Sequence, residues 1–255
     1  MSDKCIYLEC NQDQVEFYGS KFCSFHDKGG FWGNGQFYER YSILEEQFIK
    51  FIKVVPLNDP YHLKIHSPVL RGLILSICAE IEIFFKECGK YSCSLDPNNK
   101  LWNKYKELDN SGKQKKERAW NFQDYRVFKN DFPKDLSVYV LPMDEERKPF
   151  STWSGRTPPA WWNAYNSIKH NGLKSIGEAS LENTLDCLSA LFLMHCVNSY
   201  SKNYLLKFRQ GSYQNQGITS PLDSKRYLFR YGKTNSGNIY KSFRNSNSIR
   251  DKYSK

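Results

Sequence analysis

The chain has 255 residues, of which 40% are hydrophobic and 16% aromatic, and its formal net charge is +10. These values are typical of a globular protein with a full hydrophobic core. The chain opens without the basic, apolar and small-residue series of a signal peptide, and charged residues interrupt its longest apolar stretches. We therefore expect a cytoplasmic protein that has no signal peptide, no membrane span and no membrane association.

The N-terminal segment, residues 1–35, contains two closely spaced pairs of metal-ligating residues. Four residues separate Cys5 from Cys10, and two separate Cys23 from His26. Zinc takes four thiolate or imidazole ligands in a tetrahedron, which two such pairs joined by a short hairpin supply. The second pair, in Gly-Ser-Lys-Phe-Cys-Ser-Phe-His, resembles a knuckle of small zinc modules. We expect a structural Zn site here, and the alternative is a disordered segment without metal.

Two amphipathic helices follow. Apolar residues recur at helical spacing through residues 37–55, and Pro56 ends that pattern. Ser67 and Pro68 are typical of a helix start, and the stronger pattern that follows runs to about Cys88. Its apolar stripe is wide enough for the central helix of a bundle.

Two carboxylates lie on this second helix. Glu80 falls at the margin of the apolar stripe, whereas Glu82 points away from it. A carboxylate at such a margin is usually solvated or in a salt bridge, and less often it is the partner of a base on a neighbouring helix.

The middle of the chain is less regular. We expect a short helix around residues 101–108, a further helix that starts at residues 113–118, and a strand at residues 136–141. The basic residues at 113–118 are typical of a solvated helix start, with phosphate contact as the alternative. Residues 143–157 are expected to form a loop.

Residues 158–172 are the most informative stretch. Two prolines favour a helix start, and Asn-Gly favours its end. Four residues share one helical face: Trp161, Ala164, Tyr165 and Ile168. The other face carries Trp162, Asn163, Asn166, Lys169 and His170. Such a face is unusual for a solvated surface and indicates a functional site.

The longest helical pattern follows at residues 179–208. His195 lies at the edge of its apolar seam, where we expect a hydrogen-bonded core histidine rather than a metal ligand.

This order of elements resembles the HEPN superfamily of helical bundles, which includes RNA-cleaving toxins and antiviral effectors as well as non-catalytic members. The resemblance covers residues 36–208 and implies a mainly α fold, a helical bundle. Members often carry Arg-Asn-x3-His, in which Arg and His from paired subunits form a ribonuclease site. Asn166 and His170 match that motif, and Tyr165 stands in place of the Arg. The resemblance also implies a homodimer.

The missing Arg matters because a cation must stabilise the negative charge that develops at the scissile phosphate. Lys169 can supply it as a point charge, and Arg71 or Arg156 can approach from elsewhere. Histidine suits the proton transfer because it titrates near neutral pH. The resemblance thus implies a metal-independent endoribonuclease of a toxin or antiviral-defence type that uses His170, Lys169 and Asn166.

The alternative is a non-enzymatic, zinc-containing interaction module that binds nucleic acid or a partner protein. In that interpretation the Asn and His of the motif only fix the end of the helix, where a histidine interacts favourably with the helix dipole.

The positive charge of the chain is concentrated at its C-terminal end. Residues 201–255 contain twelve Lys and Arg against two Asp, a net charge of +10, so the first 200 residues sum to zero. Aromatic residues alternate with these cations among Gly, Ser and Asn. We expect residues 209–255 to be a flexible, largely disordered basic tail, with a strand only at residues 226–231, that binds RNA or other nucleic acid.

Overall fold

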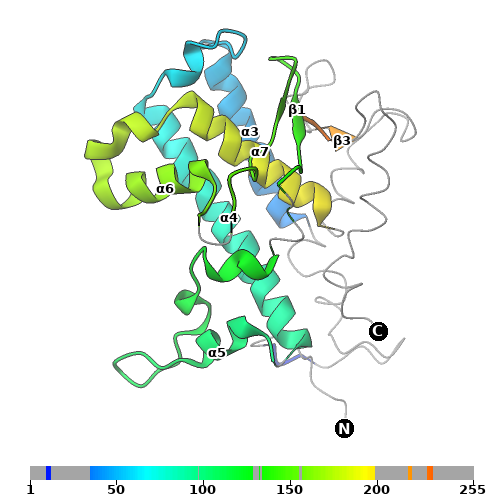
Figure 1. Cartoon of the computed structure of the whole chain (residues 1–255), viewed down its shortest axis with the longest axis vertical. Coiled ribbons are helices and arrows are strands. Elements are labelled where there is room, and N and C mark those ends of the chain that lie inside the picture. The colour runs from blue at the N-terminus through cyan, green and yellow to red at the C-terminus, as the bar shows by residue number, and fades with distance from the viewer. Residues whose placement is uncertain are drawn as a thin grey trace.

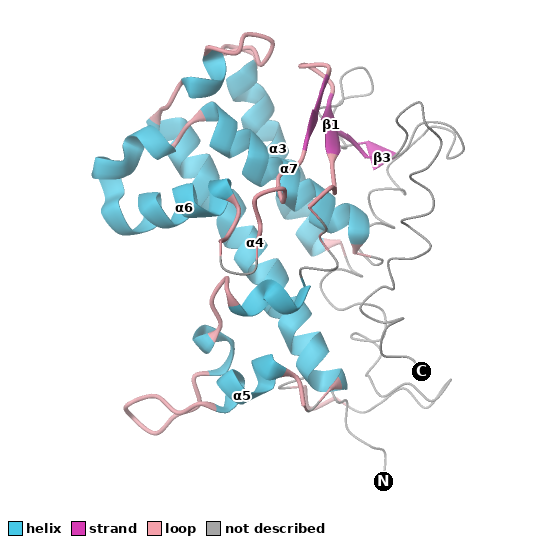
Figure 2. Ribbon diagram, in the orientation of Figure 1, coloured by secondary structure: helices cyan, strands magenta, loops and turns pink. Residues whose placement is uncertain are grey.

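The computed structural model describes residues 10–12, 35–96, 98–128, 132, 134–154, 157–198, 218–219 and 229–231. Within these ranges the chain is mainly helical, as the sequence predicts (Figure 2). The α-helices are α3 (Gln36–Ile52), α4 (Pro68–Leu95), α5 (Lys100–Lys106), α6 (Ala160–Asn171) and α7 (Leu181–Val197). Four 3₁₀ segments accompany them: η2 (His62–Lys64), η3 (Lys116–Ala119), η4 (Asp124–Phe128) and η5 (Gly172–Glu178).

The helix α4 is the central element, and α3, α6 and α7 pack against it (Figure 1). It begins as predicted, with Pro68 in its first turn and the Ser67 hydroxyl accepting a hydrogen bond from the Leu70 N–H at 3.2 Å. Its buried stripe, which includes Ile77 and Ile81, belongs to the same hydrophobic core as Phe48 of α3 and Leu188 of α7. The core therefore surrounds α4 along most of its length.

The helix α4 extends to Leu95, beyond the predicted end near Cys88. Gly89 lies inside this helix, and the ring of Trp120 occupies the space beside the glycine. The Trp120 indole N–H also donates a hydrogen bond to the Leu101 carbonyl of α5 at 3.0 Å, which fixes the segment after α5 to that helix.

The prediction of one continuous helix after residue 113 is wrong. The chain instead forms the two short segments η3 and η4, with aromatic side chains buried between them. Tyr125 stacks on Phe85 of α4 with ring centroids 4.9 Å apart, and Phe128 stacks on the same ring at 6.2 Å. Burial of these rings against α4 outweighs the local helix preference.

A small antiparallel sheet lies beside α7. Its strands are β1 (Val138–Val140), β2 (Glu145–Arg147), β3 (Ile218–Thr219) and β4 (Phe229–Tyr231), in the order β2-β1-β4-β3. The predicted strand at 136–141 is confirmed by β1, whereas β2 lies where a loop is predicted. The strand predicted within 226–231 is confirmed by β4, which pairs Phe229 with Val140, and β3 adds a second strand from the range 209–255.

The helix α6 also matches its predicted bounds. It ends at Asn171, and Gly172 follows with a φ of 56°, a left-handed conformation that favours glycine. The next helix, α7, begins at a Ser180 cap and is described to Val197, so the remainder of the pattern predicted to 208 lies outside the described residues. Of the helices in the described ranges, none has the length and apolar character needed to cross a membrane.

Candidate functional site

The helix α6 presents the two faces that the sequence predicts, with one exception. The predicted apolar face is buried against α4 and α7. On the other face, Asn166 is half-buried, and Lys169 and His170 are exposed. The placement of Trp162 on the polar face is wrong: its ring is buried, with its centroid 4.3 Å from that of Phe122. The candidate site is therefore the C-terminal half of α6.

The ammonium of Lys169 is held by two neighbours. Its Nζ lies 3.4 Å from Glu82 Oε1 on α4 and 5.2 Å from the centroid of the Tyr165 ring, one turn earlier in α6. Partial burial lowers the pKa of Lys169, but the hydrogen bond with Tyr165 and the charge of Glu82 outweigh burial and raise it above the ordinary lysine value. Lys169 therefore keeps its charge, and it directly precedes His170 in α6.

Glu82 is the residue of this site that sequence reasoning misses. Its position away from the apolar stripe of α4 indicates a solvated side chain, yet its carboxylate pairs with Lys169 of α6 and its side chain is only 26% exposed. The pairing with Lys169 spans 87 positions, so no local pattern reveals it. For the neighbouring Glu80, the sequence favours a solvated or salt-bridged carboxylate. Its carboxylate forms a salt bridge with Arg40 of α3, at 3.3 Å.

Tyr165, which stands where the expected motif would have an Arg, belongs to the buried face. Burial raises the pKa of its hydroxyl, so this position is neutral at physiological pH. Of the other cations considered for the site, Arg71 lies half-buried in the first turn of α4, and Arg156 is outside the described residues. Of the three cations considered, Lys169 is the one that the described structure shows on the same helix as His170.

Chemically, this arrangement offers a proton-transfer group and a positive charge on one accessible surface. The imidazole of His170 is exposed, and Asn166, one turn earlier, offers an amide that donates and accepts hydrogen bonds. The carboxylate of Glu82 orients Lys169 and also reduces the net positive charge of the site.

The predicted zinc ligands fall almost entirely outside the described residues. Cys5, Cys23 and His26 are not described, and Cys10 is half-buried and packs against the core. Within the described ranges, no group of three or more His, Cys, Asp or Glu is arranged to hold a metal ion. The zinc site stays a prediction.

No protein-family model, no curated protein and no solved structure matches the chain. Function must therefore be argued from the residues of the site.

Proposed function

We propose that the chain is an RNA-directed, HEPN-like effector of a toxin or antiviral-defence type that contacts RNA with the C-terminal half of α6. The observation that carries this proposal is the exposed His170 directly after the Lys169 ammonium, which Glu82 and Tyr165 hold in place. An exposed cation and an exposed imidazole on consecutive residues suit a phosphodiester substrate.

In the proposed cleavage, neutral His170 takes the proton of a ribose 2′-hydroxyl. The 2′-oxygen attacks the adjacent phosphorus, the bond from phosphorus to the 5′-oxygen breaks, and that oxygen takes a proton from water. The products are a 2′,3′-cyclic phosphate and a 5′-hydroxyl end. Lys169 stabilises the additional negative charge on the phosphate, and Asn166 donates a hydrogen bond that orients it.

The ion pair with Glu82 does not prevent such binding. The side chains of Lys169 and Glu82 are 46% and 26% exposed, and a pair with that exposure contributes at most about 1 kcal/mol. A phosphate that contacts both Lys169 and Asn166 can therefore displace the Glu82 carboxylate from Lys169. In this proposal the basic range 209–255 holds the RNA backbone, a structural zinc stabilises residues 1–35, and two chains pair as a homodimer.

A second candidate function is a non-enzymatic interaction module that binds nucleic acid or a partner protein. The buried, neutral Tyr165 favours it, because the position that often supplies a cation in HEPN ribonucleases supplies none here. The two functions differ in turnover, because only the first includes cleavage.

The test uses the purified full chain and a labelled single-stranded RNA. We expect fragments with 2′,3′-cyclic phosphate and 5′-hydroxyl ends, and a rate lower by about 10²–10⁴ in His170→Ala, because proton transfer by a positioned side chain contributes that factor. Lys169→Ala is expected to reduce the rate as well. The matched control is His66→Ala, which removes an exposed histidine outside the site.

Cleavage by His170→Ala at the wild-type rate would exclude this histidine from the reaction. Absence of cleavage by the wild-type chain, together with RNA binding that weakens steeply as salt rises, would favour the non-enzymatic module.

A further inference from the structure

Residues 100–128, which comprise α5, η3 and η4 and which we call the α5–η4 lobe, form a basic region at the end of α4 (Figure 1). The lobe contains eight Lys and Arg against four Asp and Glu, a net charge of +4. The other residues of the first 200 contain seventeen cations against twenty-one carboxylates, a net charge of −4. The balanced charge of the first 200 residues thus conceals the excess positive charge of the lobe.

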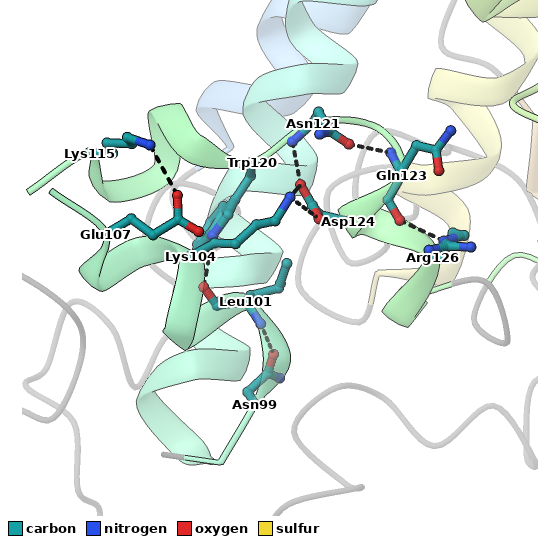
Figure 3. Close-up of polar contacts among 10 residues, drawn as sticks. All are labelled: Asn99, Leu101, Lys104, Glu107, Lys115, Trp120, Asn121, Gln123, Asp124 and Arg126. Atoms are coloured by element: carbon teal, nitrogen blue, oxygen red, sulfur yellow. Dashed lines mark hydrogen bonds and ion pairs between the residues drawn. The ribbon is translucent and has the colours of Figure 1, made fainter. Parts of the chain in front are cut away.

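The carboxylates of the lobe are engaged in its own structure. Glu107 pairs with Lys115 at 3.1 Å and Asp124 pairs with Lys104 at 2.8 Å, and both pairs join segments of the lobe (Figure 3). The remaining two are also occupied: Glu117 lies 3.8 Å from Lys90 of α4, and Asp109 accepts hydrogen bonds from the backbone N–H groups of Ser111 and Lys113. None of the four is therefore oriented only toward solvent.

The cations, by contrast, remain largely at the surface. Six of the eight are exposed: Lys100, Lys106, Lys113, Lys116, Arg118 and Arg126. The ammonium of Lys106 is positioned 5.5 Å above the ring of Trp102, which in turn stacks on Tyr105 with centroids 5.4 Å apart. Because the Trp102 ring already restricts the Lys106 side chain, this side chain loses less conformational freedom when it binds a ligand.

We infer that the α5–η4 lobe is a surface that binds the phosphate backbone of nucleic acid without reading its sequence. A concentration of exposed Lys and Arg on one small region is the electrostatic footprint of backbone binding, and phosphate contacts supply most of the affinity of such proteins. This surface is distinct from the basic range 209–255 and from the α6 site.

The lobe is nevertheless placed to act together with α6. Phe122 of the lobe contacts Trp162 near the start of α6, with ring centroids 4.3 Å apart. His170 lies eight residues further along the same helix, which corresponds to about 12 Å at 1.5 Å per residue. A strand bound on the lobe can therefore continue toward the polar end of α6.

The test compares two triple variants of the full chain. Lys100→Gln, Lys106→Gln and Lys113→Gln are combined in the lobe, and the control combines Lys53→Gln, Lys64→Gln and Lys174→Gln, which are exposed lysines elsewhere. Binding of a mixed-sequence single-stranded RNA, and of DNA with the same sequence, is measured by fluorescence anisotropy over a salt series. The lobe variant is expected to bind both more weakly and to reduce the slope of log K against log salt by about two, at about 0.7 for each lost phosphate contact.

Equal slopes for the lobe variant and the control would overturn the inference, because the loss would then follow from net charge alone. Unchanged RNA and DNA binding with weaker binding to phosphatidylserine vesicles would also overturn it and would assign the lobe to a lipid surface. Because the readout is binding, the result is independent of cleavage by His170: loss of cleavage in His170→Ala with a wild-type salt slope in the lobe variant would reject only the lobe inference.

Discussion

Gly89 lies inside α4, where a glycine ordinarily lowers helix stability because of its backbone freedom. The ring of Trp120 explains why a larger residue is not found there. A Cβ built on Gly89 would lie 2.5 Å from Cζ3 of this ring, closer than van der Waals contact allows. The absence of a side chain at one position thus allows the lobe to dock on α4.

Gly89→Ala is therefore expected to destabilise the protein by about 1–3 kcal/mol, the usual cost of inserting a methyl group into a packed core. Chemical denaturation monitored by Trp fluorescence measures the change. The matched control is Gly72→Ala on the exposed side of the same helix, where a Cβ meets no atom within 4 Å. We expect this control to increase stability by about 0.5–1 kcal/mol. Equal effects of the two substitutions would contradict the packing argument.

His195 is buried as predicted, but the hydrogen bond expected for it is absent. Neither ring nitrogen has a hydrogen-bond partner in the described structure, and the ring packs instead against Tyr41 and Phe84 with centroids 5.5 and 5.7 Å away. Burial lowers the pKa of this histidine from 6.5 to about 3. The folded protein therefore holds His195 in its neutral form.

This lowered pKa predicts a pH dependence of stability. Between pH 6.5 and about 3 the unfolded chain binds a proton at His195 that the folded chain does not, so acidification favours unfolding in this window. The expected slope from this group is about 1.4 kcal/mol per pH unit. Asp186, whose pKa burial raises from 3.8 to about 6, acts in the opposite direction between those values.

The contribution of His195 is isolated by comparing His195→Leu with the wild type in denaturation experiments at several pH values. The difference in unfolding free energy should change with pH below 6.5 and stay constant above it. The control is His66→Ala, which removes an exposed imidazole instead of the buried one. A difference that does not vary with pH would show that His195 titrates alike in both states.

At the scale of elements, the starts of α4 and α7 follow from serine caps that the sequence places locally. The Ser67 hydroxyl accepts the Leu70 N–H, and the Ser180 hydroxyl accepts the Asn183 N–H at 3.1 Å. Each bond satisfies one of the N–H groups that a helix leaves open at its first turn.

Ser67→Ala is expected to cost about 1 kcal/mol, which lowers the melting temperature of a domain of this size by about 2–4 °C. Differential scanning calorimetry measures this shift. Ser76→Ala, at an exposed interior position of α4, provides the comparison and should leave the melting temperature unchanged or slightly higher. A similar decrease in both variants would indicate that the cap does not stabilise α4.

The segments η3 and η4 show where local patterns fail. Trp120, Tyr125 and Phe128 have spacings that a helix could also accommodate, so the sequence predicts one. In the structure these rings are buried, with Tyr125 and Phe128 stacked on Phe85 of α4, and that burial determines the backbone. A sequence cannot indicate this choice, because the competing surface is supplied by residues far away in the chain.

At the scale of the whole molecule, the zinc prediction concerns residues 1–35, which lie mostly outside the described ranges. We expect metal analysis of the purified protein to find about one zinc per chain, because one Cys-Cys pair and one Cys-His pair together supply the four ligands of a tetrahedral site. Cys23→Ser should reduce that content, whereas Cys93→Ser, at a buried position in α4, should retain it. A folded, metal-free wild-type protein would contradict the prediction.

The sequence by itself determined the helical class, the starts of α4 and α6, the strand β1 and the exposed Lys169 and His170. These features depend on residues only a few positions apart, through helical periodicity, caps and turn chemistry.

Only the tertiary structure decided the pairing of Glu82 with Lys169, the addition of β4 to β1 and the basic α5–η4 lobe. The first two bring together residues that are 87 or more positions apart in the sequence. The third depends on which carboxylates of the lobe form ion pairs and which of its Lys and Arg side chains are exposed. Such contacts are selected by burial and charge in three dimensions, which no local pattern encodes.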